Sequence, residues 1–162
     1  MRVREFTDTD WPRVWPIVRE VIRAEDTFPY DPAWTSDQAR DVWVVRAPGV
    51  TAVAEEDGRI LGTAHMQSNR PGRGAHVATA SFMVAGHARG RGVGRALCEH
   101  ALDWARSLGY AGMQFNAVVE TNTAAVNLYL DLGFTIIGTV PGAFDHPRHG
   151  RVGLHVMYIE LG

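Results

Sequence analysis

The most informative segment of the chain reads Ser81-Phe-Met-Val-Ala-Gly-His-Ala-Arg-Gly-Arg-Gly-Val-Gly-Arg-Ala-Leu97. An apolar run ends at Val84, glycines then alternate at three positions, and apolar residues afterwards recur at helical spacing as far as Leu108. The pattern predicts a strand, a glycine-rich loop and a helix over residues 93–108. Glycines let successive backbone N–H groups turn toward one point, and a helix start adds unpaired N–H groups and a positive dipole end. The segment therefore predicts a site for a phosphate or pyrophosphate, formed by Arg89, Gly90, Arg91, Gly92, Val93, Gly94 and Arg95.

Two common phosphate-binding loops do not fit this segment. The dinucleotide-binding fingerprint requires Gly-x-Gly-x-x-Gly near the first strand, with an acidic residue about 20 positions later. Here the third glycine comes one residue early, and the loop lies at mid-chain. A P-loop requires Gly-Lys-Ser/Thr, and the sequence contains no lysine. The absence of lysine also excludes Schiff-base chemistry on a lysine side chain.

Composition and charge narrow the class of protein further. At 162 residues the chain is expected to form one domain, residues 1–162, that buries roughly 70% of its unfolded surface. A net charge of −2 argues against nucleic acid as the main partner. No apolar run approaches the ~20 residues that span a bilayer, so no membrane partner is expected. A single cysteine, Cys98, is compatible with a reducing compartment, for which the cytoplasm is the default.

Hydrophobic periodicity and turn residues predict a mixed α/β fold. The first helix should follow a cap at Thr7, and Pro16 should kink or split it near its start. The aromatic segment 27–34, which contains Tyr30, is expected either to form a wall of the substrate pocket or to pack as a loop on the core. Strands are expected at residues 1–6, 50–55, 60–67, 75–84, 111–119, 134–140 and 154–161, and helices through Ile22 and at 36–46, 93–108 and 122–132.

Two motifs in this order resemble those of the GCN5-related N-acetyltransferase (GNAT) family. Arg89-Gly-Arg-Gly-Val-Gly94 resembles the family's R/Q-x-x-G-x-G/A signature, and Asn122-Thr-Ala-Ala-Val-Asn-Leu-Tyr-Leu-Asp-Leu-Gly-Phe134 is similar to its N-x-x-A-x-x-L-Y-x-x-x-G-F pattern. The expected order of elements is also that of the family, so the resemblance covers nearly the whole chain. It implies a mixed, mostly antiparallel central sheet whose parallel strands splay at the cofactor cleft, flanked by about four helices. It also implies acetyl-CoA as co-substrate and no metal.

The same resemblance implies where the cofactor would lie. Backbone groups of Phe82, Met83 and Val84 would pair with the pantetheine arm, much as an added strand pairs with a sheet edge. Asn122 would reach the same arm. The glycine-rich loop would then hold the pyrophosphate.

Acetyl transfer needs a neutral amine, a polarised thioester carbonyl and a proton for the leaving thiolate. The resemblance implies that the N–H near Val84 polarises the carbonyl and that Tyr129 is the general acid. The predicted strand at residues 75–84, which precedes the glycine-rich loop, contains no acidic residue that could serve as the general base. Two candidates remain: an ordered water held by polar groups, which we favour, and Glu120, whose alternative role is to favour the following helix start.

A closer resemblance concerns the acceptor. Gln67-Ser-Asn-Arg-Pro71, Phe115-Asn116 and Val119-Glu-Thr-Asn122 look like segments of fungal acetyltransferases that detoxify the proline analogue azetidine-2-carboxylate. This implies that Asn69 and Asn116 bind or orient a small amino acid. Asn116 lies on an otherwise apolar strand, where it is either a satisfied core polar group or a substrate ligand. The segment 144–149, with Asp145 and His146, is expected either to close over the substrate or to be a solvated connector.

The leading prediction is therefore an N-acetyltransferase for a small amine, such as an amino acid or a toxic amino-acid analogue, with a role in detoxification. A protein or peptide N-acetyltransferase and a non-catalytic CoA-binding sensor are the alternatives. An aminoglycoside acetyltransferase is disfavoured because such a pocket should be acidic, and the loops contain no clustered acids. Dimerisation through the last strands is common in the family, which makes a homodimer a candidate assembly.

Overall fold

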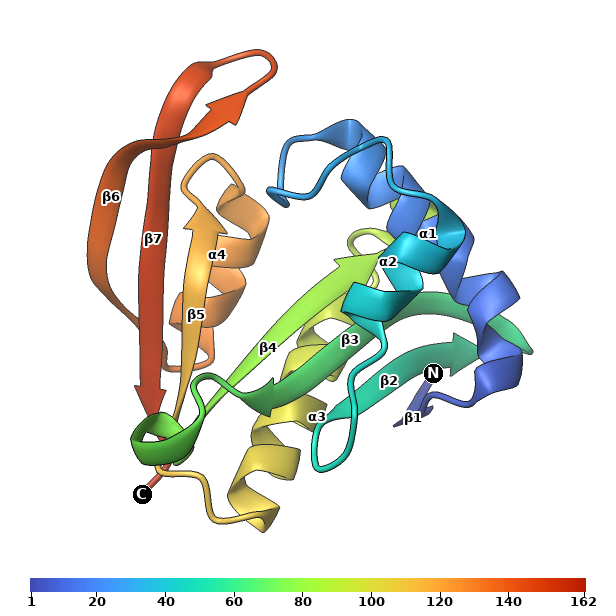
Figure 1. Cartoon of the computed structure of the whole chain (residues 1–162), viewed down its shortest axis with the longest axis horizontal. Coiled ribbons are helices and arrows are strands. Elements are labelled where there is room, and N and C mark those ends of the chain that lie inside the picture. The colour runs from blue at the N-terminus through green and yellow to red at the C-terminus, as the bar shows by residue number, and fades with distance from the viewer.

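One seven-stranded sheet runs through the molecule, in the strand order β1-β2-β3-β4-β5-β7-β6 (Figure 1). The computed structural model describes all residues from Met1 to Gly162. All neighbouring strands pair antiparallel except β4 and β5, which are parallel. The strands are β1 (Arg2–Glu5), β2 (Val50–Glu56), β3 (Arg59–Ser68), β4 (Val77–Val84), β5 (Gly112–Val119), β6 (Thr135–His146) and β7 (Gly150–Glu160).

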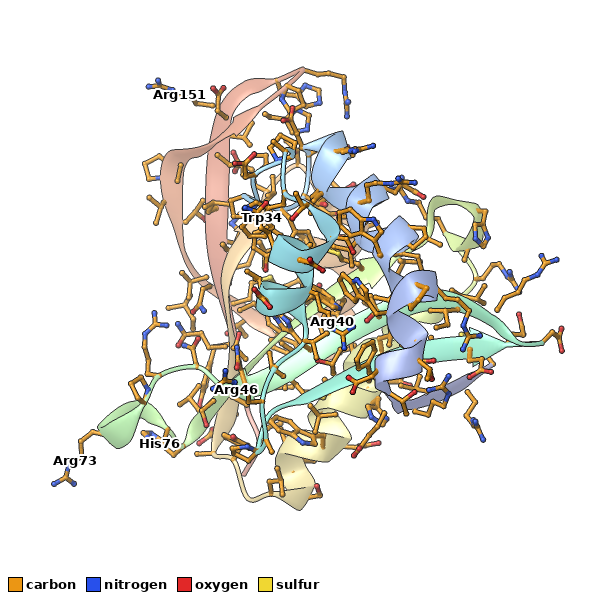
Figure 2. The ribbon with its side chains drawn as sticks, turned by 45° about the vertical axis from the view of Figure 1, so that its right-hand side comes forward. Trp34, Arg40, Arg46, Arg73, His76 and Arg151 are labelled. Carbon is orange, nitrogen blue, oxygen red and sulfur yellow. The ribbon has the colours of Figure 1, made fainter.

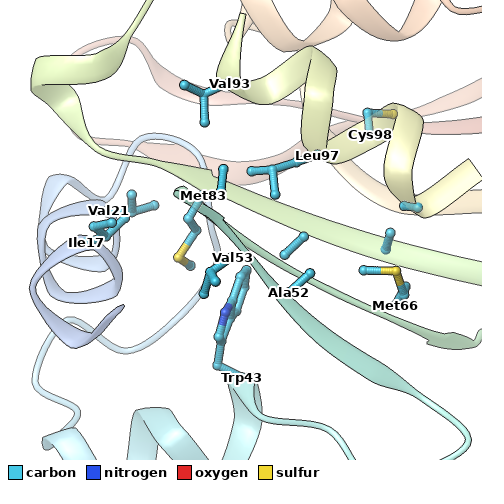
Figure 3. Packing of buried hydrophobic residues seen from close by; sticks show 14 of the residues in the cluster. Ile17, Val21, Trp43, Ala52, Val53, Met66, Met83, Val93, Leu97 and Cys98 are labelled. Atoms are coloured by element: carbon cyan, nitrogen blue, oxygen red, sulfur yellow. The ribbon is translucent and has the colours of Figure 1, made fainter. Parts of the chain in front are cut away.

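Four helices flank the sheet: α1 (Trp11–Ala24), α2 (Ser36–Trp43), α3 (Val93–Ser107) and α4 (Thr123–Asp131). Figure 3 shows that α1 and Trp43 of α2 pack on one face of the sheet, whereas Val93, Leu97 and Cys98 of α3 pack on the other. Buried apolar residues of both layers form one continuous core with the strands between them. The expected mixed sheet with a parallel pair and four helices is thus confirmed. None of the helices is long and apolar enough to cross a bilayer.

Of the two effects expected of Pro16, a kink or a split, the split does not occur, because the first helix is continuous. Proline lacks an N–H, so the only helical bond lost is the one that would reach the carbonyl of Pro12 in the first turn. The helix therefore continues to Ala24.

The last two strands are longer than the sequence pattern predicts. Residues 141–153, which were expected to connect the last two strands, are mostly strand themselves. Strands β6 and β7 pair as far as His146↔Gly150, and only residues 147–149 form the turn. A register shift between Val140 and Phe144 accommodates Pro141 and Gly142, the residues that resemble a turn in the sequence. The hairpin therefore extends beyond the other strands toward the α1–α2 loop (Figure 1).

The parallel pair is short, and this opens the sheet. Only Val77↔Gly112 and Ala78↔Met113 pair between β4 and β5. Beyond these two positions the strands diverge, and β5 stays with β7 through an irregularity between Phe115 and Val118 (Figure 1). A wedge-shaped gap results, and it widens toward the hairpin turn. His76 and Arg151 of this hairpin lie at opposite ends of the molecule (Figure 2). His76 is therefore far from the wide end of the gap.

Candidate functional site

A cavity of about 760 Å³ occupies the gap between β4 and β5. Its volume lies within the usual range for small-molecule and cofactor sites. Its lining residues come from both halves of the chain: Val21 and members of the segments 26–30, 79–84, 88–95, 115–119, 121–129 and 146–149. The divergent parts of β4 and β5, helix α4, the loop before α3, the α1–α2 loop and the β6–β7 turn all contribute to it.

The β4 edge of the cavity carries free backbone groups. Ala85 N–H donates to the Leu61 carbonyl at 2.9 Å, which makes these two residues a hydrogen-bonded antiparallel pair. Such pairs alternate along a ladder, so the backbone groups of Phe82 and Val84 turn away from β3 and toward the gap. Those of Met83 turn toward β3, and its side chain is buried in the core. Of the three predicted backbone contacts, Phe82 and Val84 are therefore the available ones.

The glycine-rich loop has the backbone conformation that an anion nest requires. Gly90 and Gly92 have φ angles of 75° and 80°, a left-handed conformation that favours glycine. Gly92 is the N-cap of α3, and the first helical bond runs from Ala96 N–H to its carbonyl. The N–H groups of residues 93–95 consequently have no partner within the helix. The loop and the helix dipole together offer a positive pole at the cavity.

The three arginines of this loop have different surroundings. Arg89 lines the cavity and makes no ion pair. Arg95 also lines it, but its guanidinium pairs with Asp131 of α4. Arg91 points away from the cavity and pairs with Glu56 of β2. Arg89 is thus the arginine that is free to meet a phosphate, and Arg91 lies outside the site.

Tyr129 of α4 lies on the cavity wall, among aromatic rings. Its ring centroid is 4.6 Å from that of Phe115 and 6.2 Å from that of Phe82. Its hydroxyl makes no hydrogen bond within the protein and is open to a ligand. Burial raises the pKa of Tyr129 well above its usual value, because desolvation disfavours the phenolate. The group therefore stays protonated at neutral pH and can donate a proton.

The start of α4 provides two further polar groups. Asn122 is the N-cap of α4, and its Oδ1 accepts the Ala125 N–H at 3.4 Å, which leaves its Nδ2 available to the cavity. Thr121 also lines the cavity, and its buried Oγ1 has no hydrogen-bond partner. A buried hydroxyl without a partner is costly, so Thr121 is a candidate ligand group. The sequence offers no signal for it beyond its position next to Asn122.

Asn69 and Asn116 contact each other across the sheet. Asn116 Nδ2 donates to Asn69 Oδ1 at 2.7 Å, Asn69 Nδ2 donates in return at 3.3 Å, and Gln114 Nε2 donates to Asn116 Oδ1 at 2.9 Å. Asn116 lines the cavity, whereas Asn69 lies behind it. Asn116 is exposed and is therefore not a core polar group. Its amide has partners within the protein and lines the cavity, so its role as a substrate ligand stays a prediction.

Glu120 is outside the cavity. Its Oε1 accepts the Gly153 N–H of β7 at 2.6 Å, and its own backbone N–H donates to the Gly153 carbonyl at 3.1 Å. A Cβ at position 153 would approach Thr139 to 2.6 Å and the Glu120 carboxylate to 3.1 Å, so glycine permits this contact. The carboxylate is therefore used in joining β5 to β7.

Replacement of Glu120 by glutamine tests that role. The amide keeps an oxygen for the Gly153 N–H, so we expect kcat within about twofold of the wild type and an unchanged pH–rate profile. The measurement is acetyl-transfer rate from pH 6 to pH 9. Loss of an ionisation from the profile together with a large fall in kcat would instead identify Glu120 as the base.

The hairpin turn and the aromatic loop form the end of the cavity. His146, Arg148 and His149 line it, whereas Asp145 is exposed and lies opposite Arg151 in the ladder. Neighbouring residues of a strand point to opposite faces, which is why His146 reaches the cavity and Asp145 does not. Of the two residues that the sequence singled out in this segment, His146 lines the cavity and Asp145 does not, whereas Arg148 and His149 were included only as part of the segment 144–149.

Tyr30 fits both of its predicted roles. It lines the cavity, and its ring stacks on that of Trp34 with the two ring centroids 5.0 Å apart. The centroid of the Phe28 ring is 5.2 Å from that of Tyr30. The loop is thus packed on the core and forms a wall of the cavity. No group of three or more His, Cys, Asp or Glu side chains is arranged to hold a metal ion.

Known proteins resemble this chain in sequence and in structure. A family model described as "Acetyltransferase (GNAT) family" matches residues 13–134. A GCN5-related N-acetyltransferase from Kribbella flavida is 56% identical, with a TM-score of 0.96 over 98% of this chain and 96% of that one. The protein yncA from Salmonella typhimurium, whose structure contains acetyl-CoA, is 24% identical with a TM-score of 0.84, over 100% of this chain and 94% of that one. The second likeness concerns the fold alone.

Two fungal relatives match in sequence. N-acetyltransferase aca1 of Schizosaccharomyces pombe is 28% identical over 154 residues, which are 86% of this chain and 71% of aca1. Protein SPT10 of Saccharomyces cerevisiae is 35% identical over 105 residues, or 59% of this chain. That match spans only 16% of the length of SPT10.

Proposed function

This chain belongs to the acetyltransferase (GNAT) family, whose members are acyltransferases, and on that premise we propose that it transfers acetyl from acetyl-CoA directly to the amine of a small molecule. One observation carries the proposal: the unpaired edge of β4 leads from the glycine nest to Tyr129 within a single cavity. A nest, a strand edge and a protonated hydroxyl are the three features that a phosphate, an amide-containing arm and a leaving thiolate require.

The residues present fit acetyl-CoA. When bound, it supplies the activated acetyl thioester. The nest and Arg89 would hold the pyrophosphate, and the free backbone groups of Phe82 and Val84 would pair with the pantetheine arm. Asn122 Nδ2 and the unpartnered Thr121 hydroxyl are further donors along the same wall. Val84 N–H would polarise the thioester carbonyl, and Tyr129 would hold the proton needed by the thiolate.

A small acceptor fits the end of the cavity better than a polypeptide does. Arg148 of the hairpin turn donates to Asp26 of the α1–α2 loop at 3.4 Å, so these two segments meet at this end of the cavity. An extended peptide would need a continuous groove there. Together with the segments that resemble fungal azetidine-2-carboxylate acetyltransferases and the position of Asn116, this favours an amino acid or amino-acid analogue as acceptor, and detoxification as the role.

A homodimer through the last strands is the assembly that we favour. Strand β6 forms an edge of the sheet, with Ile137 64% exposed and Val140 55% exposed. An exposed apolar edge strand is a template for pairing with another chain. Light scattering at micromolar concentration would test this, and a monomer would contradict it.

The function is tested by incubating the protein with acetyl-CoA and a panel of free amino acids, cyclic amino acids and simple amines. We expect thiol release above an amine-free blank for at least one acceptor, and an acetylated product by mass spectrometry. Binding of acetyl-CoA without turnover of any amine would contradict the proposal and favour the CoA-binding module.

Replacement of Gly92 by alanine should weaken acetyl-CoA binding about tenfold. An alanine in the left-handed region costs about 1–2 kcal/mol, and relief of that strain would turn the nest N–H groups away from the pyrophosphate. Calorimetric titration with acetyl-CoA measures the effect. The matched control is Gly109→Ala, at φ 78° but at the far end of α3, which should lower stability and leave Kd unchanged. Equal Kd values for both variants would show that the nest does not hold the ligand.

A further inference from the structure

The turn between β6 and β7 fixes the imidazole of His146 in one tautomer. His146 is only 5% exposed. The backbone N–H groups of Arg148 and His149 both donate to its Nδ1, at 3.1 Å and 3.2 Å. A nitrogen that accepts must carry no proton, so the proton of the neutral ring is on Nε2. That Nε2–H has no partner in the protein, and the ring lies on the cavity wall.

This arrangement makes His146 a hydrogen-bond donor and excludes it as the general base. Its basic nitrogen, Nδ1, is already occupied by two backbone N–H groups. Burial lowers the pKa of His146, and the charges of His149 and Arg148 lower it further against the opposing effect of Asp26. The Nε2–H group is a donor without a partner in the protein, on a residue that lines the cavity, so it is free to donate to a ligand there.

Arg148 adds a positive charge beside this donor. Its guanidinium makes a single contact, at 3.4 Å to Asp26, and its side chain is 65% exposed. Asp26 is the only carboxylate among the residues that line the cavity. Four of the five guanidinium N–H groups are therefore free for a ligand. The adjoining wall, Phe28, Pro29 and Tyr30, is apolar and uncharged.

We propose that the β6–β7 turn is a carboxylate-binding subsite, in which His146 Nε2–H and the Arg148 guanidinium bind the acceptor. A guanidinium matches the planar, two-oxygen geometry of a carboxylate. The acceptor class is then an amine that also carries a carboxylate, with its apolar part against Phe28 and Tyr30. This assignment rests on the proposed function only in that the amine of the bound molecule is acetylated. Binding of its carboxylate at the subsite does not require acetyl transfer.

The test compares three forms of each amino acid in a panel: the free acid, its methyl ester and its amide. Affinity is measured by calorimetry on protein saturated with CoA, and acetyl transfer is measured in parallel. We expect the wild type to bind at least one free acid ten or more times more tightly than its ester, since a charge-assisted bidentate contact is lost.

Two variants and one control assign the effect to the turn. Arg148→Gln removes the charge, and His146→Asn keeps an oxygen near the position of Nδ1 for the two backbone N–H groups but removes the Nε2–H donor. Each should lower the affinity of the acid about tenfold and that of the ester less than twofold. Arg151→Gln, an exposed charge of β7 that does not line the cavity, should change neither (Figure 2). Melting temperatures of the variants check that the fold is retained.

The outcomes separate the subsite from the proposed function. Equal affinity for acid and ester, or no binding of any acid, would overturn the subsite even if amines are acetylated. Selective binding of an acid that depends on Arg148 and His146, with no thiol release, would support the subsite and overturn acetyl transfer.

Discussion

Tyr129→Phe should lower kcat about 100-fold, the range typical of one acid–base group. The substitution removes only the hydroxyl and keeps the ring that packs on Phe115 and Phe82. Since the hydroxyl makes no hydrogen bond within the protein, its loss should leave stability and acetyl-CoA affinity nearly unchanged. A fall in kcat without a fall in binding is the signature of a group that acts in the transition state.

The matched control for this prediction is Tyr110→Phe. Its hydroxyl contacts Ser68 at 2.8 Å and lies outside the cavity, so its loss should not affect kcat. The pKa of Tyr129 is raised by burial, so the wild type should lose activity with loss of this proton only at alkaline pH. The Phe variant should lack that alkaline limb. An unchanged kcat in Tyr129→Phe would remove the role of general acid.

Asp10→Asn should lower the free energy of unfolding by about 3–5 kcal/mol, the cost of breaking a buried ion pair. The Asp10 side chain is 1% exposed, and its two oxygens accept from both terminal nitrogens of Arg4, at 2.8 Å and 2.9 Å. Arg13 and the N–H of Thr7 also donate to it, at 2.9 Å and 2.8 Å. An amide would offer one oxygen in place of two and would leave the guanidinium of Arg4 partly unpaired.

Urea unfolding measures this loss, with Asp8→Asn as the control. Asp8 pairs with Arg40 at 2.9 Å, but its side chain is 91% exposed, and such pairs contribute about 0.5 kcal/mol or less. Similar losses in both variants would show that burial of Asp10 is not what makes its contacts strong.

The contribution of Asp10 should depend on pH in one direction. Hydrogen bonds from Arg4 hold the pKa of Asp10 far below its usual value, despite the opposing effect of burial. A pKa lower in the folded than in the unfolded state stabilises the protein above the unfolded value, about 3.9, and this stabilisation is lost as the pH falls toward the folded value. The difference between wild type and Asp10→Asn should therefore be constant above about pH 5 and shrink in acid. A difference that grows in acid would contradict this sign.

Much of the cofactor end could be predicted because its signals are local. The positive φ angles of Gly90 and Gly92 follow from residue type, and the helix after them follows from apolar spacing within one segment. Tyr129 occurs in the motif Asn122–Phe134, whose residues also indicate where the helix that carries it begins and ends. The sequence did not distinguish Arg89 from Arg91 and Arg95, because Glu56, the partner of Arg91, comes from β2, and Asp131, which hydrogen-bonds to Arg95, comes from α4.

The acceptor end was less predictable for the same reason. Pro141 and Gly142 resemble a turn locally, but pairing with β7 holds them within a strand and moves the turn to residues 147–149. That extension decides that His146 and Arg148 face the cavity while Asp145 does not. Glu120 likewise lies close to the site in the sequence, but pairing of β5 with β7 places the Gly153 N–H against its carboxylate, a contact that no local pattern indicates.

Residue types and their spacing were therefore sufficient for the order of the elements, the anion nest and the position of the tyrosine. Backbone conformation and periodicity depend on neighbours within a few residues, and the sequence carries that information directly. The width of the gap between β4 and β5, the partners of each charged side chain and the composition of the acceptor wall depend on contacts between segments up to 122 residues apart, as in the Asp26–Arg148 pair. Such contacts exist only once the chain has packed, because no local pattern specifies which distant segment will lie opposite.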